Sequence, residues 1–330
     1  MTELEAFLQR QPLDYSDTAA LGQCLRALVE VGLDQLPLPG SGRTLERFQS
    51  LAAVGAHDLG VCKLYEGHTD ALAIIEQLGG RVQAGSTWGM WAAEPPNARL
   101  RVSHQGQRVT LHGRKAWCSG AAVVSHGLVT AWDEQDRQQL VAVALDQPGV
   151  TITDQGWQAV GMATTGSVEV LFDGAVGEAI GGPADYLSRP GFWQGGIGIA
   201  ACWYGAAQGL AQHLQQHCAE REEPHALAHL GAVDRALHAA ATVLRSSASS
   251  IDAAPLDNAE CLARRARAVV EDAAEQVIRH VGHALGAGPY CKDRRFARLS
   301  ADLPVFLRQS HAERDLAALG QLVTGSTWTL

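Results

Sequence analysis

The chain has 330 residues, of which 46% are hydrophobic and 18% charged, so it is long and apolar enough to form more than one hydrophobic core. Its formal net charge is −9 and its basic clusters are short, which argues against a general affinity for nucleic acid or for an anionic membrane surface. Seven dispersed cysteines without a CxxC pair, and the lack of an apolar run of about 20 residues, predict a cytoplasmic protein with reduced thiols and no membrane span.

The first two segments of the chain differ in their apolar pattern. Residues 1–86 are predicted to form a helical domain, because apolar residues recur at three- and four-residue spacing over 18–33 and in two further stretches that end at Gly79-Gly80. Residues 87–180 contain short runs rich in Val and Thr, beginning with a hairpin around a glycine turn at Gly106. Several such runs without intervening helices predict an antiparallel sandwich or barrel.

The last segment, residues 181–330, contains four long, Ala-rich amphipathic stretches with short connections. The fourth stretch covers 293–322. This pattern predicts an antiparallel four-helix bundle. The expected fold class is therefore α+β, with an N-terminal helical domain, a central antiparallel β domain and a C-terminal bundle.

Three stretches of sequence resemble the acyl-CoA dehydrogenase superfamily of flavoproteins. They are "HGRKAWCSGAAVVSHGLVTA" at 112–131, the strand–turn–strand region at 141–176 with its Gly-Met pair, and the glycine-rich opening of the bundle at 195–214. The resemblance implies the fold of that superfamily, FAD as cofactor and a homodimer or homotetramer formed through the bundle. It also implies a small-molecule substrate, an acyl thioester oxidised between Cα and Cβ with hydride transfer to flavin N5.

The resemblance also implies roles for individual residues. Trp117 falls where the family places a Trp against the isoalloxazine ring, and Ser119 where a hydroxyl contacts the flavin N5 and O4 edge. Without the resemblance, Trp117 is better explained as a core aromatic residue of the β domain. Ser119 is explained equally well as a turn hydroxyl that bonds its own backbone. The remaining implied cofactor contacts are a turn at the pyrimidine end and positions near a partner subunit's FAD: Trp91, Ala93, Glu94, Arg221, Gly286 and Gly288. For the last two, a simple helix C-cap is the alternative.

The sequence departs from the family pattern around the cofactor and acyl regions. The loop after Glu94 is short, and Ala93 stands where the family has Thr. Gly196 replaces an Arg near the CoA-binding opening, and Pro224 follows Arg221 where a Phe is expected. The adenine half of an FAD site is therefore poorly matched.

The largest departure concerns the catalytic base. Dehydrogenation needs a carboxylate that removes the α-proton, and the family supplies a Glu near the C-terminus. Here Ser310 and His311 occupy that place, and Glu313 is the nearest carboxylate. A His at this position resembles the flavin monooxygenase branch of the same fold, because histidine can exchange a proton near neutral pH. His311 and Ser310 are thus the catalytic candidates, with an exposed helix face as the alternative.

A third possibility is a catalytically degenerate member that binds ligands or partners without turnover. Two histidine pairs at four-residue spacing, His213 with His217 and His225 with His229, are interpreted as solvated helix positions, and no metal site is predicted.

Overall fold

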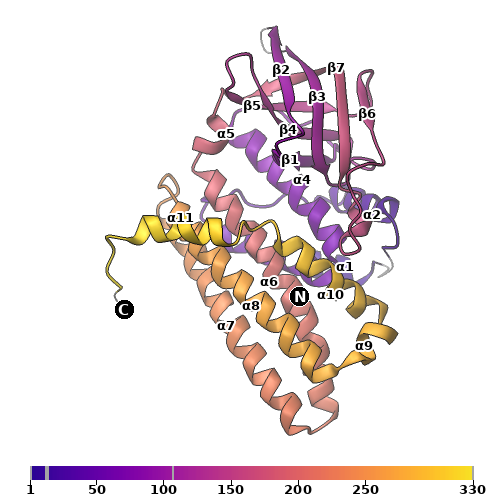
Figure 1. Ribbon diagram of the computed structural model, residues 1–330, viewed down its shortest axis with the longest axis vertical. Coiled ribbons are helices and arrows are strands. Elements are labelled where there is room, and N and C mark those ends of the chain that lie inside the picture. Colours follow the sequence, from indigo (N-terminus) through magenta and orange to yellow (C-terminus); the bar gives the residue numbers. More distant parts are fainter. Residues whose placement is uncertain (1, 12–14, 106–107, 329–330) are drawn as a thin grey trace. The chain divides into compact units, whose positions relative to one another are not determined.

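The computed structural model describes residues 2–11, 15–105 and 108–328 (Figure 1). The described chain divides into two compact units. The first takes the N-terminal stretch through Leu8, then Pro37–Leu59 and the chain from Trp193 onward. The second comprises Gln9–Leu36 and Gly60–Phe192.

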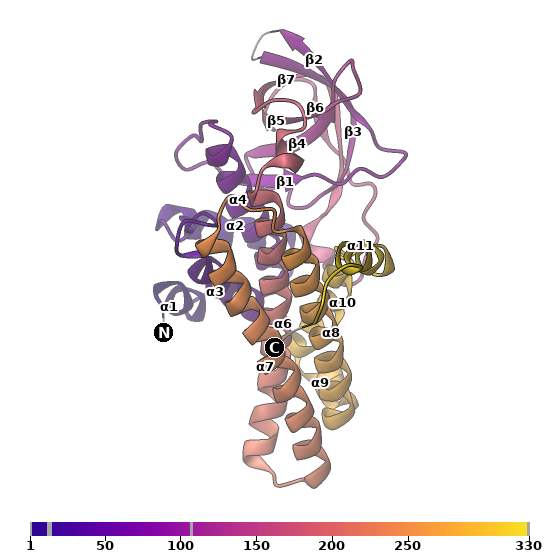
Figure 2. The same ribbon diagram turned by 90° about the vertical axis from the view of Figure 1, so that its left-hand side faces the viewer.

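The first unit is helical. Pro224 occupies the first turn of α7, where its missing N–H costs no hydrogen bond, and α7 and α8 lie side by side along most of their length (Figure 1, Figure 2). Asp252 of α7 accepts hydrogen bonds from the backbone N–H groups of Gly42 and Thr44 and so stabilises the start of α3. The helices of this unit are α1 (Glu3–Gln9), α3 (Thr44–His57), α6 (Gly191–Glu220), α7 (Pro224–Ala253), α8 (Glu260–Leu285), α9 (Ala287–Lys292), α10 (Arg294–Leu307) and α11 (Glu313–Val323).

Glycines allow α3 and α6 to approach each other closely. A Cβ on Gly205 of α6 would lie 1.9 Å from the carbonyl oxygen of Ala52, and one on Gly55 of α3 would lie 2.5 Å from the oxygen of Cys202. Real Cβ atoms do not approach carbonyl oxygens to these distances, so the crossing needs glycine at both places.

The fourth predicted bundle stretch is not one helix. α10 ends at Leu307 and α11 begins at Glu313, so the prediction of a single helical segment over 293–322 is wrong at this point. Between them, Ala312 has φ 44° and ψ −116°, and its N–H donates to the Ser310 hydroxyl oxygen. Serine bonds of this kind compete with the helical ladder and favour an interruption.

The second unit is a β barrel with helices α2 (Thr18–Glu30), α4 (Leu59–Gln77) and α5 (Asp185–Ser188). Strands β4, β5, β7, β3 and β2 pair in that order, and one bridge between Arg101 and Trp132 returns β2 to β4. The strands are β1 (Trp88–Trp91), β2 (Leu100–Gln105), β3 (Arg108–Cys118), β4 (His126–Trp132), β5 (Gln138–Ala144), β6 (Val150–Ile152) and β7 (Val168–Ile180).

Most strand pairs are antiparallel, as the absence of helices between the runs predicted, but β1–β4 and β2–β4 are parallel. A period of two does not encode strand direction, so sequence alone could not separate these pairs. The predicted β2–β3 hairpin is present, whereas its glycine turn at Gly106 lies outside the described residues.

Helix α4 covers part of the barrel core. Ala71, Ile74 and Ile75 of α4 pack with Trp88 of β1 and with residues of β4, β5 and β7. This contact places α4 directly beside β1. Over the described part of the chain, no helix combines the length and apolar character needed to cross a membrane.

Candidate functional site

Trp117 lies in a bulge near the end of β3. The register between β3 and β7 shifts between Lys115 and Cys118, and Trp117 has φ 56°, in the left-handed region. A bulky residue rarely adopts this conformation, which costs roughly 1–2 kcal/mol. The side chain is 53% exposed, so Trp117 is not a core residue. The bulge presents a flat aromatic surface to its surroundings, while burial raises the pKa of the adjacent Cys118 thiol and keeps it protonated.

Ser119 belongs to a chain of three hydroxyl groups. Its Oγ lies 2.7 Å from Ser167 Oγ, which lies 2.8 Å from Thr165 Oγ1. Thr165 Oγ1 donates to the carbonyl oxygen of Met162 over 2.8 Å. The Ser119 hydroxyl therefore bonds a loop 48 residues away, not its own backbone.

Trp91 is the last residue of β1 and contacts the same turn. Its indole N–H donates to the carbonyl oxygen of Ser119 over 3.1 Å. A small hollow with a cavity volume of about 10 Å³, room for about one water molecule, is lined by residues of α4, all four residues of β1, and Ser119 and Val124. Ala93 follows β1 and has no side-chain group that can hydrogen-bond a cofactor.

Glu94 is committed to partners inside the barrel. Its Oε1 lies 2.7 Å from Lys115 Nζ and also accepts the Thr130 hydroxyl, and its Oε2 accepts the Trp132 indole N–H over 2.8 Å. Burial tends to raise the pKa of Glu94, but Lys115, Thr130 and Trp132 outweigh burial and lower it. Both carboxylate oxygens of Glu94 are therefore already engaged within the barrel. Sequence reasoning missed Lys115, which is fully buried, because β3 also carries Arg114 beside it and no local signal tells the buried cation from the other one.

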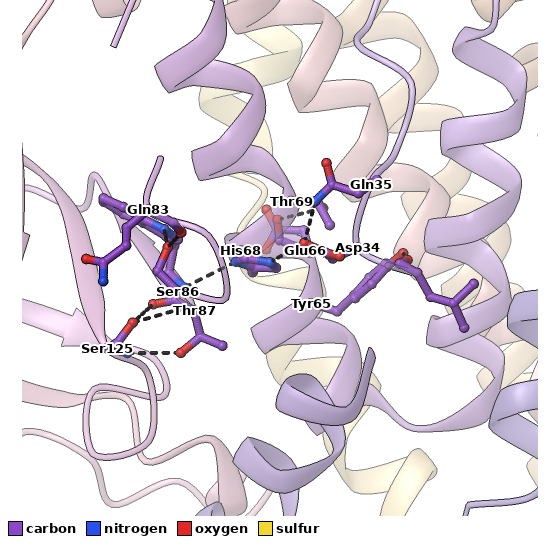
Figure 3. Close-up of polar contacts among 12 residues, drawn as sticks. Asp34, Gln35, Tyr65, Glu66, His68, Thr69, Gln83, Ser86, Thr87 and Ser125 are labelled. Carbon is purple, nitrogen blue, oxygen red and sulfur yellow. Dashed lines mark hydrogen bonds and ion pairs between the residues drawn. The ribbon is translucent and has the colours of Figure 1, made fainter. Parts of the chain in front are cut away.

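A buried polar network attaches β1 to α4 (Figure 3). His68 of α4 accepts the backbone N–H of Trp88 at Nδ1, over 3.2 Å, so its proton must reside on Nε2, which lies 3.1 Å from Asp34 Oδ2. The Trp88 indole N–H donates to Ser86 Oγ over 2.7 Å. Because an amide occupies Nδ1, His68 cannot relay a proton; it fixes the position of the strand that carries Trp91.

Ser310 and His311 lie in the interruption between α10 and α11. The His311 backbone N–H donates to Asp315 Oδ2 over 2.9 Å, and its imidazole Nδ1 lies 3.6 Å from the same oxygen. Asp315 Oδ1 accepts from Arg264 Nη1 over 2.9 Å. Burial opposes it, yet the His311 amide and the neighbouring positive charges lower the pKa of Asp315. The His311 side chain is 58% exposed, but it projects from a strained turn and not from a regular helix face.

Arg221, Gly286 and Gly288 lie at the other end of the bundle. Arg221 is exposed just beyond α6, Gly286 is the C-cap of α8 with φ 61°, and Gly288 lies in α9. Arg267 of α8 donates to the carbonyl oxygen of Gln309, which places the α10–α11 interruption about 28 Å along α8 from Gly286. Within one chain, the structure does not bring the glycines to Ser310 and His311.

Metal-binding side chains do not gather in the described ranges: no group of three or more His, Cys, Asp or Glu residues there is arranged to hold a metal ion.

Comparison with known protein structures identifies the fold. No family model matches the sequence, and neither does any curated protein. A nitrososynthase from Micromonospora carbonacea var. africana aligns with a TM-score of 0.81 at 18% identity, covering 98% of each chain. A candidate acyl-CoA dehydrogenase from Mycobacterium smegmatis gives 0.82 at 15% identity over 98% of this chain and 96% of its own. The chain has the acyl-CoA dehydrogenase-like fold.

TdsC, a dibenzothiophene monooxygenase from Paenibacillus sp. A11-2, gives a TM-score of 0.75 in its FMN-bound structure, at 17% identity over 96% of this chain and 98% of its own. The acyl-CoA dehydrogenase-like fold confirms the fold class expected from the sequence. At identities of 15–18%, the likeness concerns the fold alone.

Proposed function

We propose that the chain is a flavin-dependent oxidoreductase and that Trp117 forms the surface for the isoalloxazine ring. The support is the strained bulge that holds the Trp117 indole 53% exposed, one residue from a buried thiol and two from the Ser119 hydroxyl. A strained backbone that exposes an aromatic side chain is a feature of binding sites more than of packing. Ser119 is assigned to the flavin N5 edge.

We propose FMN as the flavin in place of the FAD that the sequence resemblance implied. The positions expected to hold an adenine half are poorly equipped: Arg221 is exposed beyond α6, and Pro224 begins α7 where the family has Phe. TdsC, which shares the fold, contains FMN in its crystal structure. Parallel titrations with FMN and FAD test this choice, and tighter binding of FAD contradicts it.

The reaction that fits this chain best is monooxygenation of a small molecule. The observation that carries this proposal is the interruption at Ser310–Ala312, which presents a histidine where acyl-CoA dehydrogenation requires a carboxylate base. Asp315 and Arg264 support the turn, with the Asp315 carboxylate 3.6 Å from the His311 ring. An imidazole beside a carboxylate is suited to delivering and recovering a proton.

A bound reduced flavin supplies the two electrons with which dioxygen places one oxygen atom on a substrate and releases the other as water. The chain's own residues would bind and orient the flavin and exchange a proton. In the barrel unit, Trp117 would cover a ring face and Ser119 would contact its polar edge. In the helical unit, His311 would exchange a proton at an imidazole nitrogen.

The test compares wild-type protein with His311→Gln and with Glu313→Gln, a neighbouring exposed side chain that serves as the matched control. Reduced FMN is loaded anaerobically and mixed with dioxygen, and indole, a ligand of TdsC, is the probe for incorporation of labelled oxygen. His311→Gln should retain flavin binding within threefold and lose roughly 100-fold in oxygen transfer, the size of a general acid–base contribution. Glu313→Gln should behave like wild type.

Two results contradict the proposal. Failure of oxidised and reduced flavins to bind removes the flavoenzyme assignment. Anaerobic bleaching of bound flavin by an acyl-CoA, with His311→Gln unaffected, assigns the chain to the dehydrogenases instead.

A further inference from the structure

The three hydroxyl groups that end at Ser119 have a fixed direction. Thr165 Oγ1 lies 2.8 Å from the carbonyl oxygen of Met162, and a carbonyl oxygen can only accept. The Thr165 proton is therefore committed to Met162. Thr165 Oγ1 must then accept from Ser167, over 2.8 Å, and Ser167 Oγ must accept from Ser119, over 2.7 Å.

Burial keeps this direction in place. Thr165 is fully buried and Ser167 is 4% exposed, so water does not compete for their protons. Thr165 is the last residue of the 3-10 turn Ala163–Thr165, and Ser167 follows two residues later; the turn is flanked by Met162 and Gly166 in the left-handed conformation. The Gly120 N–H donates to the carbonyl oxygen of Thr165 over 2.8 Å, which ties this turn to the end of the Ser119 turn.

The consequence is that Ser119 presents lone pairs and no proton to a ligand. In flavins, N5 carries a hydrogen in the reduced state and a bare lone pair in the oxidised state. A reduced flavin can donate its N5–H to Ser119 Oγ, whereas an oxidised flavin would face one acceptor with another. To serve oxidised flavin, all three hydroxyl groups must reverse, and Thr165 must give up its bond to Met162.

We infer that Ser167 and Thr165 are specificity-determining residues that make Ser119 a hydrogen-bond acceptor and thereby favour reduced over oxidised flavin. This inference rests on the proposed function, because it requires Ser119 at the flavin N5 edge. The loss of one neutral hydrogen bond sets the size of the effect, roughly three- to tenfold in relative affinity.

The experiment measures dissociation constants for oxidised and reduced FMN, anaerobically, for wild type, Ser167→Ala and Thr165→Val. Either substitution frees the Ser119 proton, so the ratio of the oxidised to the reduced dissociation constant should fall by roughly three- to tenfold. The same change appears as a shift of the bound flavin's two-electron midpoint potential, about 30 mV for each factor of ten. Because it is read as a binding ratio and a potential, the effect does not depend on turnover.

Thr153→Val is the matched control. Thr153 Oγ1 also donates to a backbone carbonyl of the barrel, that of Glu169, over 2.7 Å, but it has no bond to Ser119. For Thr153→Val, the ratio of the oxidised to the reduced dissociation constant should equal that of wild type. If circular dichroism shows that one of the two test variants is unfolded, the ratio measured for the other variant tests the inference.

Failure of this inference and failure of the proposed function give different results in this experiment. If FMN binds and both variants keep the wild-type ratio, the direction of the hydroxyl chain does not select the redox state, and the inference is wrong while the proposed function stands. If wild type binds neither redox form, the proposed function fails and the inference fails with it.

Discussion

Lys115→Met tests whether the buried ion pair stabilises the barrel around Trp117. Lys115 is fully buried, and its ammonium donates to Glu94 Oε1 at 2.7 Å and to the backbone and side-chain oxygens of Thr130 at 2.8 and 2.6 Å. Methionine has a similar length and no charge, so the substitution leaves Glu94 without its counterion. Breaking a buried pair in this way costs about 3–5 kcal/mol. Glu94 keeps 23% of its side-chain exposure and can recover some hydration, so we expect about 3 kcal/mol.

The pKa of Glu94 predicts how the stability cost of Lys115→Met changes with pH. In wild type the pKa of Glu94 is lowered, so its contribution to stability is present above its unfolded pKa and is lost as the pH falls through the folded value. Without Lys115, the pKa of Glu94 rises from its lowered value, because the ion pair no longer offsets burial. The variant therefore loses less stability than wild type on acidification. The stability difference from wild type should therefore shrink between pH 7 and pH 4.

Urea denaturation at both pH values measures these differences. The double variant Lys115→Met/Glu94→Gln should recover part of the lost stability, because it removes the stranded charge. Arg101→Met is the matched control: Arg101 pairs with Asp136 at 2.7 Å on the same barrel, but the two side chains are 50% and 64% exposed, so we expect less than about 1 kcal/mol. A cost for Lys115→Met no larger than that of Arg101→Met would refute the reasoning.

Three further predictions concern other parts of the chain. Trp117→Leu keeps an apolar side chain but removes the flat ring, so the FMN dissociation constant should rise roughly five- to tenfold, and an unchanged value in an equilibrium titration would count against the ring-stacking role. Burial lowers the pKa of His57 from 6.5 to about 4, so the unfolded chain binds a proton at a higher pH than the folded chain. The folding stability of wild type should therefore fall by up to about 3 kcal/mol between pH 6.5 and pH 4. The urea midpoint of His57→Gln should change less over the same pH range. Gly205→Ala places a Cβ 1.9 Å from the Ala52 oxygen and should lower the free energy of unfolding by about 2–3 kcal/mol. In the control Gly231→Ala, the new Cβ meets no atom within 4 Å, so this variant should stabilise α7 by about 1 kcal/mol. Equal shifts of the melting temperature for the two variants would contradict the packing argument.

Periodicity predicted the elements because burial imposes it. The stripe over 18–33 became α2, and the Val- and Thr-rich runs became strands, since one face of each had to meet a core. The interruption at Ser310–Ala312 escaped prediction because the apolar spacing of α10 and α11 reads as continuous across it. What ends α10 is local: a serine hydroxyl that bonds a backbone N–H and an alanine in a strained conformation.

The candidate site was only partly readable for a related reason. Trp117 and Ser119 were identified by resemblance, but neither the bulge that exposes Trp117 nor the partner of Ser119 is encoded nearby in the sequence. Ser167 reaches Ser119 only because β3 pairs with β7, and the shift in their register produces the bulge. Long-range pairing of this kind leaves no local signal.

Backbone strain offers a pointer to the site that does not depend on resemblance. In the described chain, five residues other than glycine have positive φ: Trp117, Asp136, Met162, Ala184 and Ala312. Asp136 and Ala184 occupy turns, where such conformations are inexpensive for a small or Asx residue. In the barrel unit, Trp117 lies two residues before Ser119, and the Met162 carbonyl oxygen accepts the last bond of the hydroxyl chain that begins at Ser119. In the helical unit, Ala312 directly follows His311. Strain persists only where the surroundings enforce it, so in each unit it singles out the segment that carries a proposed functional residue.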